Sequence, residues 1–309
     1  MIFSRATVAA VTLFAATVGA CSHSGPSALA EARRTFSTQV AFAGHEAAAP
    51  TPPPATFNKV AYPSAVGRLA AYLTADPGDG GRHPAIVWIT GGDCNSLGDV
   101  WRASPRSNDQ TAAAYRKAGI VMMFPSLRGG NDNPGRQEGF YGEVDDVLAA
   151  YDYVSKLPYV DPARIYLGGH STGGTLALLT AEVRNPFRAV FAFGPVGDVS
   201  GYGPDVLPVD LGKLNPLERS LRAPGNWLGS ARGQVYVIEG SEAPSNISPL
   251  REMRRSSYNA ALHFVEIPSA THFSVLAPSN EYIARAIVAD IGASGRFEMH
   301  EAGLQARRP

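Results

Sequence analysis

Short apolar runs recur along the chain and alternate with Gly- and Pro-rich stretches. Wholly apolar runs of this length are typical of strands in a parallel sheet that is covered on both faces. The pattern predicts strands at residues 59–61, 68–74, 85–90, 120–124, 164–167, 189–193, 234–238 and 262–267. We expect the first two strands to pair as an antiparallel hairpin.

Between these runs, apolar residues recur at helical spacing. Val144, Val147, Leu148 and Tyr151 keep one face of a helix apolar, and Pro158 ends the run. Further helices are expected at residues 108–118, 172–183 and 280–291. The alternation of strands and helices predicts an α/β fold with a mostly parallel eight-stranded sheet covered by helices on both faces.

The N-terminus has the pattern of a targeting segment. A short basic start is followed by an apolar run, which only threonines interrupt, and then by small residues before Cys21. This order is typical of a secretory signal peptide, here residues 1–20. Val18-Gly19-Ala20-Cys21 resembles the lipobox of bacterial lipoproteins, which implies a lipid on Cys21 and anchoring in the bacterial cell envelope, at the outer membrane. The alternative is an ordinary signal peptide with a nearby cysteine.

Composition divides the rest of the chain. Residues 21–56 are rich in Ala, Ser and Pro, so we expect an extended tether there. The folded domain is expected at residues 57–293, followed by a polar, frayed tail at 294–309. Within the domain, residues 199–233 lose the strand–helix alternation and form either a small cap or a long connection.

Charge and cysteine content exclude several classes of protein. The chain has 27 Lys and Arg against 27 Asp and Glu, and no basic cluster stands out, so no nucleic-acid partner is expected. The two cysteines, Cys21 and Cys94, form no disulfide framework if Cys21 carries a lipid. Because His and Cys residues lack ligand spacing, the sequence implies neither a metal nor an organic cofactor.

One turn carries candidate chemistry. The apolar run at 164–167 leads into Gly169-His170-Ser171-Thr172-Gly173, and a predicted helix follows. This strand–turn–helix context resembles the nucleophile turn of the α/β-hydrolase fold, which implies that Ser171 is a nucleophile. Bulk at Gly169 or Gly173 would collide with the neighbouring strand and helix. The alternative is a Gly-rich turn without chemistry.

The resemblance implies an oxyanion hole beside Ser171. The amide of Thr172 would lie at a helix start, where its N–H stabilises negative charge. The second donor would be the amide of Gly92 or Asp93, in the loop after the strand at 85–90. A plain turn is the alternative there. We expect Cys94, in the same loop, to be a packing residue.

The resemblance also implies a histidine base and a carboxylate downstream of Ser171. His272 follows the last predicted strand and is the expected base, whereas His263 lies inside that strand. For the acid we expect Glu242, after the strand at 234–238, with Asp198 as its rival. His170 is expected to point away from Ser171.

A longer resemblance covers residues 62–291. It joins this chain to the catalytic domain of the prolyl oligopeptidase family and to dienelactone-hydrolase-like esterases. The motifs that carry it are residues 64–71, Gly91-Gly92, Ser126-Leu127-Arg128-Gly129-Gly130, Phe140-Tyr141-Gly142, Asp145-Asp146-Val147 and residues 169–174. In that family the arginine at the position of Arg128 is structural. The usual His-Gly-Gly is Thr90-Gly91-Gly92 here, and the acid is not the usual Asp.

The resemblance implies a serine hydrolase that cleaves a carboxylic ester or small amide by acyl transfer through Ser171. Its partners would be a small ester or short peptide substrate and, through the lipid, a membrane. A serine aminopeptidase or oligopeptidase is the alternative enzyme. A non-catalytic binding lipoprotein on the same fold is the alternative of another class.

Overall fold

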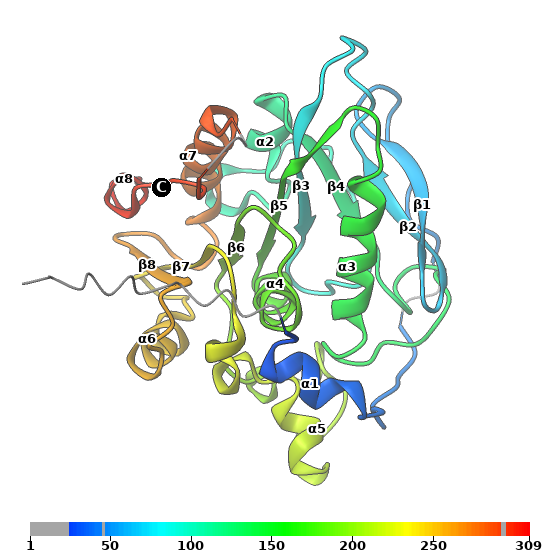
Figure 1. Ribbon diagram of the computed structural model, residues 1–309, viewed down its shortest axis with the longest axis vertical. Coiled ribbons are helices and arrows are strands. Elements are labelled where there is room, and N and C mark those ends of the chain that lie inside the picture. Colours follow the sequence, from blue (N-terminus) through cyan, green and yellow to red (C-terminus); the bar gives the residue numbers. More distant parts are fainter. Residues whose placement is uncertain (1–24, 45–46, 292–294) are drawn as a thin grey trace, which may run out of the picture.

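The computed structural model describes residues 25–44, 47–291 and 295–309, and an eight-stranded sheet forms its centre (Figure 1). The strands are β1 (Asn58–Ser64), β2 (Gly67–Leu73), β3 (His83–Ile89), β4 (Val121–Pro125), β5 (Val160–His170), β6 (Val190–Phe193), β7 (Val235–Gly240) and β8 (Leu262–Ile267). Their order across the sheet is β1-β2-β4-β3-β5-β6-β7-β8. β2 runs antiparallel to β1 and β4, and every other neighbouring pair is parallel.

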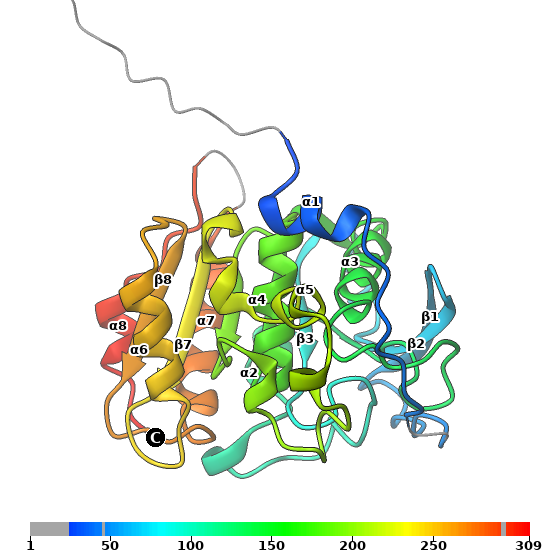
Figure 2. The same cartoon turned by 90° about the horizontal axis from the view of Figure 1, so that it is seen from below.

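Helices cover both faces of this sheet (Figures 1 and 2). One face carries α1 (Ala28–Arg34), α3 (Glu143–Val154), α4 (Thr172–Val183) and α6 (Ile247–Ser256). The other carries α2 (Ala113–Lys117), α7 (Leu276–Ala289) and α8 (Glu301–Gln305), while α5 (Pro216–Ser220) belongs to the connection between β6 and β7. The predicted mostly parallel sheet with two helical layers is therefore confirmed.

The central strand β3 shows why its apolar run has no polar positions. Ala85, Val87 and Ile89 enter the core beneath α3 and α4. Ile86 and Trp88 point to the opposite face and enter the core beneath α2 and α7. Successive side chains of a strand alternate between faces, and both faces are covered here, so every position of the run is buried.

Two helices differ from the sequence prediction. The helix expected at 108–118 is a 3₁₀ turn at Arg106–Asn108 followed by α2, because Ala112 adopts a left-handed conformation with a φ of 45°. The helix expected at 280–291 is α7, which begins at Leu276 and ends at Ala289. Leu276 is fully buried, so the earlier start adds an apolar contact with the core.

Part of the segment expected to be a tether packs against the domain. Ser27 caps α1, Leu29 is fully buried, and Val40 is 2% exposed. The Arg33 guanidinium donates to the carbonyl of Tyr141 at 3.0 Å. A few apolar residues in a polar segment are enough for docking because the domain supplies the rest of the core.

The signal peptide and Cys21 lie outside the described residues. Among the residues that are described, no helix combines the length and the apolar character needed to cross a bilayer.

The C-terminal segment, expected to be frayed, is also packed. Phe297 is 1% exposed and makes an edge contact with Tyr166, and Leu304 of α8 is fully buried. His263 bonds Glu301 of α8 at 2.8 Å, so its role is structural, as its place inside a strand suggested. These contacts make residues 295–309 part of the layer that covers β8.

Residues 199–233 form short helical turns rather than a separate unit. The turns are Val199–Gly201, Leu211–Lys213, α5, Pro224–Asn226 and Leu228–Ser230, and the last two pack against α4. Leu221 and Leu228 are buried in the core beneath this layer. Residues 224–230 of the segment therefore form a connection that covers α4.

Glu182 lies near the end of α4 and is fully buried. Neither of its carboxyl oxygens has a hydrogen-bond partner among the described residues. Burial raises the pKa of Glu182 well above its ordinary value, since nothing compensates the charged form. The carboxyl therefore binds its proton more tightly in the folded chain than in the unfolded chain.

We predict that Glu182→Met raises the free energy of unfolding by about 1–3 kcal/mol at pH 8, because it removes a buried group without partners. A carboxyl whose pKa rises on folding loses stability as the pH increases above the unfolded value of 4.5. The gap between variant and wild type should therefore widen from pH 5 to pH 8 in urea unfolding. Glu182→Gln is the control for charge alone, and a gap that narrows with pH would contradict the prediction.

Candidate active site

Ser171 lies on a strained turn between β5 and α4. Its backbone has a φ of 56° and a ψ of −115°, a conformation that costs a non-glycine residue on the order of 1–3 kcal/mol. The Ser171 N–H donates to the carbonyl of Phe193 at 2.7 Å, and the Thr175 N–H donates to the carbonyl of Ser171 at 2.8 Å. These bonds fix the turn at the carboxyl end of the sheet.

The glycines of the motif are required by close backbone approach. A Cβ on Gly169 would lie 2.4 Å from the carbonyl oxygen of Gly173, and a Cβ on Gly173 would lie 2.3 Å from that of Ile89. Both distances are far below contact, so only glycine fits. The predicted reason for the Gly-x-Ser-x-Gly pattern is confirmed.

His272 lies in the loop after β8 and is held through its backbone and its ring. Its N–H donates to the carbonyl of Pro244 at 2.7 Å, and its carbonyl accepts from Nε2 of His170 at 2.9 Å. Its Nδ1 donates to Oε2 of Glu239 at 2.9 Å. With Nδ1 carrying the proton, Nε2 of the neutral ring is left as the acceptor.

The carboxylate partner of His272 is Glu239, which the sequence prediction missed. Glu239 is fully buried at the end of β7, where Oε1 accepts from the Gly240 N–H at 2.9 Å and from the Ser245 hydroxyl at 3.2 Å. A Cβ on Gly194 would lie 2.3 Å from Oε2 of Glu239, so glycine there leaves room for the pair.

The two expected acids lie elsewhere. Glu242 is exposed, and its carboxylate accepts from the Ser241 hydroxyl. Asp198 caps the turn at Val199–Gly201 and forms an ion pair with Arg219 at 2.7 Å. Neither residue bonds His272, so the structure corrects the expected acid to Glu239.

His170 points away from Ser171, as expected, and holds the loop of His272. Burial and the neighbouring His272 ring lower the pKa of His170 to about 3, which keeps the imidazole neutral. Its Nε2 donates to the carbonyl of His272, and its Nδ1 accepts from Nε2 of Gln110 at 2.8 Å. Oε1 of Gln110 accepts from the Gly91 N–H at 3.3 Å. The side-chain amide of Gln110 therefore links His170, in the nucleophile turn, to the loop after β3.

The two loops expected to form an oxyanion hole meet at Thr172. Thr172 is the first residue of α4, where backbone N–H groups lack partners within the helix. Its hydroxyl donates to the carbonyl of Gly92 at 2.9 Å, which ties the loop of Gly92 and Asp93 to the helix start. Gly92 has a φ of 77°, a conformation that favours glycine.

Cys94 and Tyr202 lie near the start of α4. Burial and the carboxylates of Glu143 and Asp93 raise the pKa of Cys94, so its thiol stays protonated, in keeping with a packing role. Burial raises the pKa of Tyr202, whereas hydrogen bonding to the Thr175 and Ser171 side chains lowers it. The Tyr202 hydroxyl bonds the Thr175 hydroxyl at 2.8 Å, one turn into the helix that follows Ser171, although sequence patterns did not single it out.

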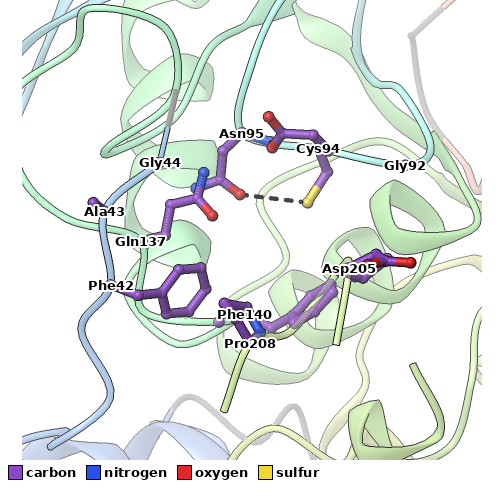
Figure 3. A pocket seen from close by; sticks show the side chains of 13 residues that line it. Phe42, Ala43, Gly44, Gly92, Cys94, Asn95, Gln137, Phe140, Asp205 and Pro208 are labelled. Atoms are coloured by element: carbon purple, nitrogen blue, oxygen red, sulfur yellow. Dashed lines mark hydrogen bonds between the residues drawn. The ribbon is translucent and has the colours of Figure 1, made fainter. Parts of the chain in front are cut away.

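A cavity of about 200 Å³ adjoins these loops (Figure 3). Its walls come from four parts of the chain and comprise residues 42–44, 92–95, Gln137, Gly139, Phe140, Asp205, Val206 and Pro208. The ring of Phe140 stacks on that of Tyr202, with centroids 5.6 Å apart. The cavity therefore adjoins the loop of Gly92 and Asp93, whose neighbour Gly91 approaches Ser171: a Cβ on Gly91 would lie 3.2 Å from Cβ of Ser171.

Arg128 has the structural role that was expected. Its guanidinium donates to both oxygens of Asp146, at 2.8 and 3.0 Å, and to Glu138 at 2.8 Å. These bonds brace the loop between β4 and α3 that forms part of the cavity wall. Among the described residues, no group of three or more His, Cys, Asp or Glu could hold a metal ion.

Residues 106–211, which include Ser171, match the family model described as "Prolyl oligopeptidase family". S-formylglutathione hydrolase of Mus musculus is 32% identical over 153 residues, which are 42% of this chain and 51% of that protein. The chain spans about half the length of the curated relatives it matches.

Solved structures of α/β hydrolases share this fold. Dipeptidyl peptidase 4 of Porphyromonas gingivalis superposes with a TM-score of 0.59 and 20% identity over 76% of this chain and 35% of that chain. An esterase of Pyrobaculum calidifontis superposes with a TM-score of 0.54 and 18% identity over 77% of this chain and 86% of that chain. The expected α/β-hydrolase fold and the resemblance to the prolyl oligopeptidase family are confirmed.

We predict that Glu239→Gln slows labelling of Ser171 by a fluorophosphonate about 10²- to 10⁴-fold, because the amide no longer fixes the tautomer of His272. Labelling rates of the purified variants measure this. Glu242→Gln and Asp198→Asn are the matched controls, and both should stay within about threefold of wild type. Equal slowing in Glu242→Gln would contradict the assignment.

Proposed function

We propose that this chain is a serine hydrolase that cleaves a carboxylic ester or a small amide by acyl transfer through Ser171. The observation that carries the proposal is the bond from His272 to the buried carboxylate of Glu239. The His272 ring lies 4.5 Å, between centroids, from that of His170, which directly precedes the serine on the strained turn. The match to the prolyl oligopeptidase family over residues 106–211 supports the same chemistry.

The proposed reaction follows from the orientation of the His272 ring. Nε2 takes the proton of Ser171 while Oγ attacks the carbonyl carbon, and Glu239 stabilises the resulting imidazolium. The amide of Thr172 and an amide of the Gly92–Asp93 loop hold the oxyanion. His272 then gives its proton to the leaving group, which departs. In the second half, Nε2 takes a proton from water as its oxygen attacks the acyl carbon, and returns that proton to Ser171 Oγ as the bond to the acyl group breaks.

A serine aminopeptidase or oligopeptidase remains the second candidate. The family model and the structural likeness to dipeptidyl peptidase 4 favour it, whereas the relative named S-formylglutathione hydrolase favours an ester or thioester. The binding-lipoprotein alternative rested on the absence of the usual acid, and Glu239 removes that support.

We predict that Ser171→Ala lowers kcat/KM for p-nitrophenyl acetate by about 10⁴-fold or more, since the acyl intermediate forms on the Ser171 hydroxyl. Initial rates with wild type and variant measure this, and circular dichroism of both checks folding. Parallel assays with aminoacyl anilides separate esterase from peptidase. Full activity of Ser171→Ala would exclude the proposal.

The cellular location is part of the same proposal. We propose that Cys21 is lipidated and anchors the domain at the bacterial outer membrane, with the domain in the periplasm or at the cell surface. Support comes from the order of a basic start, an apolar run and small residues before Cys21. The serine at position 22, in place of an aspartate, is compatible with the outer membrane. A lipid would bring a membrane surface within reach of the docked N-terminal segment.

We predict that Cys21→Ala abolishes incorporation of an alkyne-tagged fatty acid during bacterial expression, because the acceptor thiol is lost. The variant should also move from the detergent phase to the aqueous phase in a Triton X-114 partition. Cys94→Ala is the matched control and should keep the label. Labelling that persists in Cys21→Ala would overturn the anchor.

A further inference from the structure

The N-terminal segment forms one wall of the cavity beside Ser171. We call residues 36–44 the N-terminal strap. Phe42 pairs with Gln137 through two backbone hydrogen bonds, each 3.0 Å long. A Cβ on Gly44 would lie 1.8 Å from the carbonyl oxygen of Gly129, so the strap backbone touches the loop between β4 and α3.

The strap is also fixed before it reaches the cavity. The Thr38 hydroxyl donates to the Glu218 carboxylate and accepts from the Arg222 guanidinium, and the Gln39 N–H donates to Glu218 at 3.1 Å. Arg222 and Glu218 form a buried ion pair at 2.7 Å. Two sets of contacts therefore hold Phe42 in place from either side.

The Phe42 ring faces the cavity, across from Phe140, Pro208 and Asp205 (Figure 3). A Cβ on Gly139 would lie 3.7 Å from the ring of Phe42, so the ring packs over that glycine. Apart from Asp93 and Asp205, the lining side chains are apolar or uncharged, and none of the lining residues is Lys, Arg or His. The walls suit a short apolar group and disfavour an anionic one.

The lining of the cavity assigns it to the acyl group in the proposed reaction. Its lining includes Gly92 of the oxyanion loop but no residue of the loop that carries His272. Because His272 protonates the leaving group, the leaving group must face the imidazole, and the acyl group takes the other side of Ser171. The volume of about 200 Å³ is below the roughly 300–1,000 Å³ of pockets for drug-sized ligands.

We propose that Phe42 of the N-terminal strap closes the acyl pocket and restricts the enzyme to short, uncharged acyl groups. This inference rests on the proposed hydrolase function. The strap lies outside residues 106–211, the span matched by the family model.

The test compares full-length wild type, Phe42→Ala and Phe36→Ala on p-nitrophenyl acetate, butyrate and octanoate. Phe42→Ala should raise the octanoate-to-acetate ratio of kcat/KM by about tenfold or more, since a pocket that gains room for methylenes discriminates less. Phe36 lies on the same strap but packs on Tyr141, with ring centroids 5.9 Å apart, so its removal should leave the ratio within about twofold.

An unchanged ratio in an active Phe42→Ala, or an equal shift in Phe36→Ala, would overturn the inference. If Phe42→Ala does not fold, Phe42→Trp tests the inference instead. The larger ring should lower the butyrate-to-acetate ratio of kcat/KM, and an unchanged ratio would contradict a role of Phe42 in the acyl pocket. If wild type neither hydrolyses any ester nor reacts with a fluorophosphonate at Ser171, the proposed function falls too. If the wild type hydrolyses esters but the Phe42 variants leave the kcat/KM ratios unchanged, the acyl-pocket inference is wrong and the proposed hydrolase function stands.

Discussion

The close approach of three backbones at the Ser171 turn is the constraint on which the rest of the site depends. β5 must end, reverse and start α4 within a few residues, while the carbonyl of Ile89 at the end of β3 lies 2.3 Å from where a Cβ of Gly173 would be. This proximity brings the loop of Gly91 and Gly92 to the start of α4, where the Thr172 hydroxyl fixes it. The glycines thus create the oxyanion loop as well as the nucleophile turn.

Two buried glutamates show what separates a functional carboxylate from a merely buried one. Glu239 accepts hydrogen bonds from His272, the Gly240 N–H and the Ser245 hydroxyl, and these donors offset the cost of burying its charge. Glu182 has no donors among the described residues, and burial raises its pKa. Burial without donors therefore favours the protonated form of a carboxyl group. Hydrogen-bond donors at the end of a strand and in a loop allow a buried carboxylate to act as the partner of a histidine base.

The strands and the nucleophile could be predicted because the repeat of apolar residues and the spacing of glycines can be read from a short stretch of sequence. The predicted strand at 262–267 and helix at 172–183 coincide with β8 and α4. The acid could not be placed, because pairing with β8 extends β7 to Gly240, two residues beyond the apolar run. Sequence placed Glu239 at the start of a loop, whereas the sheet holds it buried beside His272. A boundary set by a tertiary contact thus decides which glutamate is used.

The predictions of an extended tether and a frayed tail were wrong for a different reason. An average over a segment rich in Ala, Ser and Pro hides single anchors such as Leu29, and a polar tail hides Leu304, yet each is fully buried. Such segments cannot fold alone, but they need only a few contacts once a sheet and its helices exist. The cavity beside Ser171 is walled by the N-terminal strap and by residues 205–208, neither of which carries a fold signal. The sheet and its helices therefore position the candidate catalytic residues, whereas the irregular segments that pack on them shape the cavity that a substrate must fit.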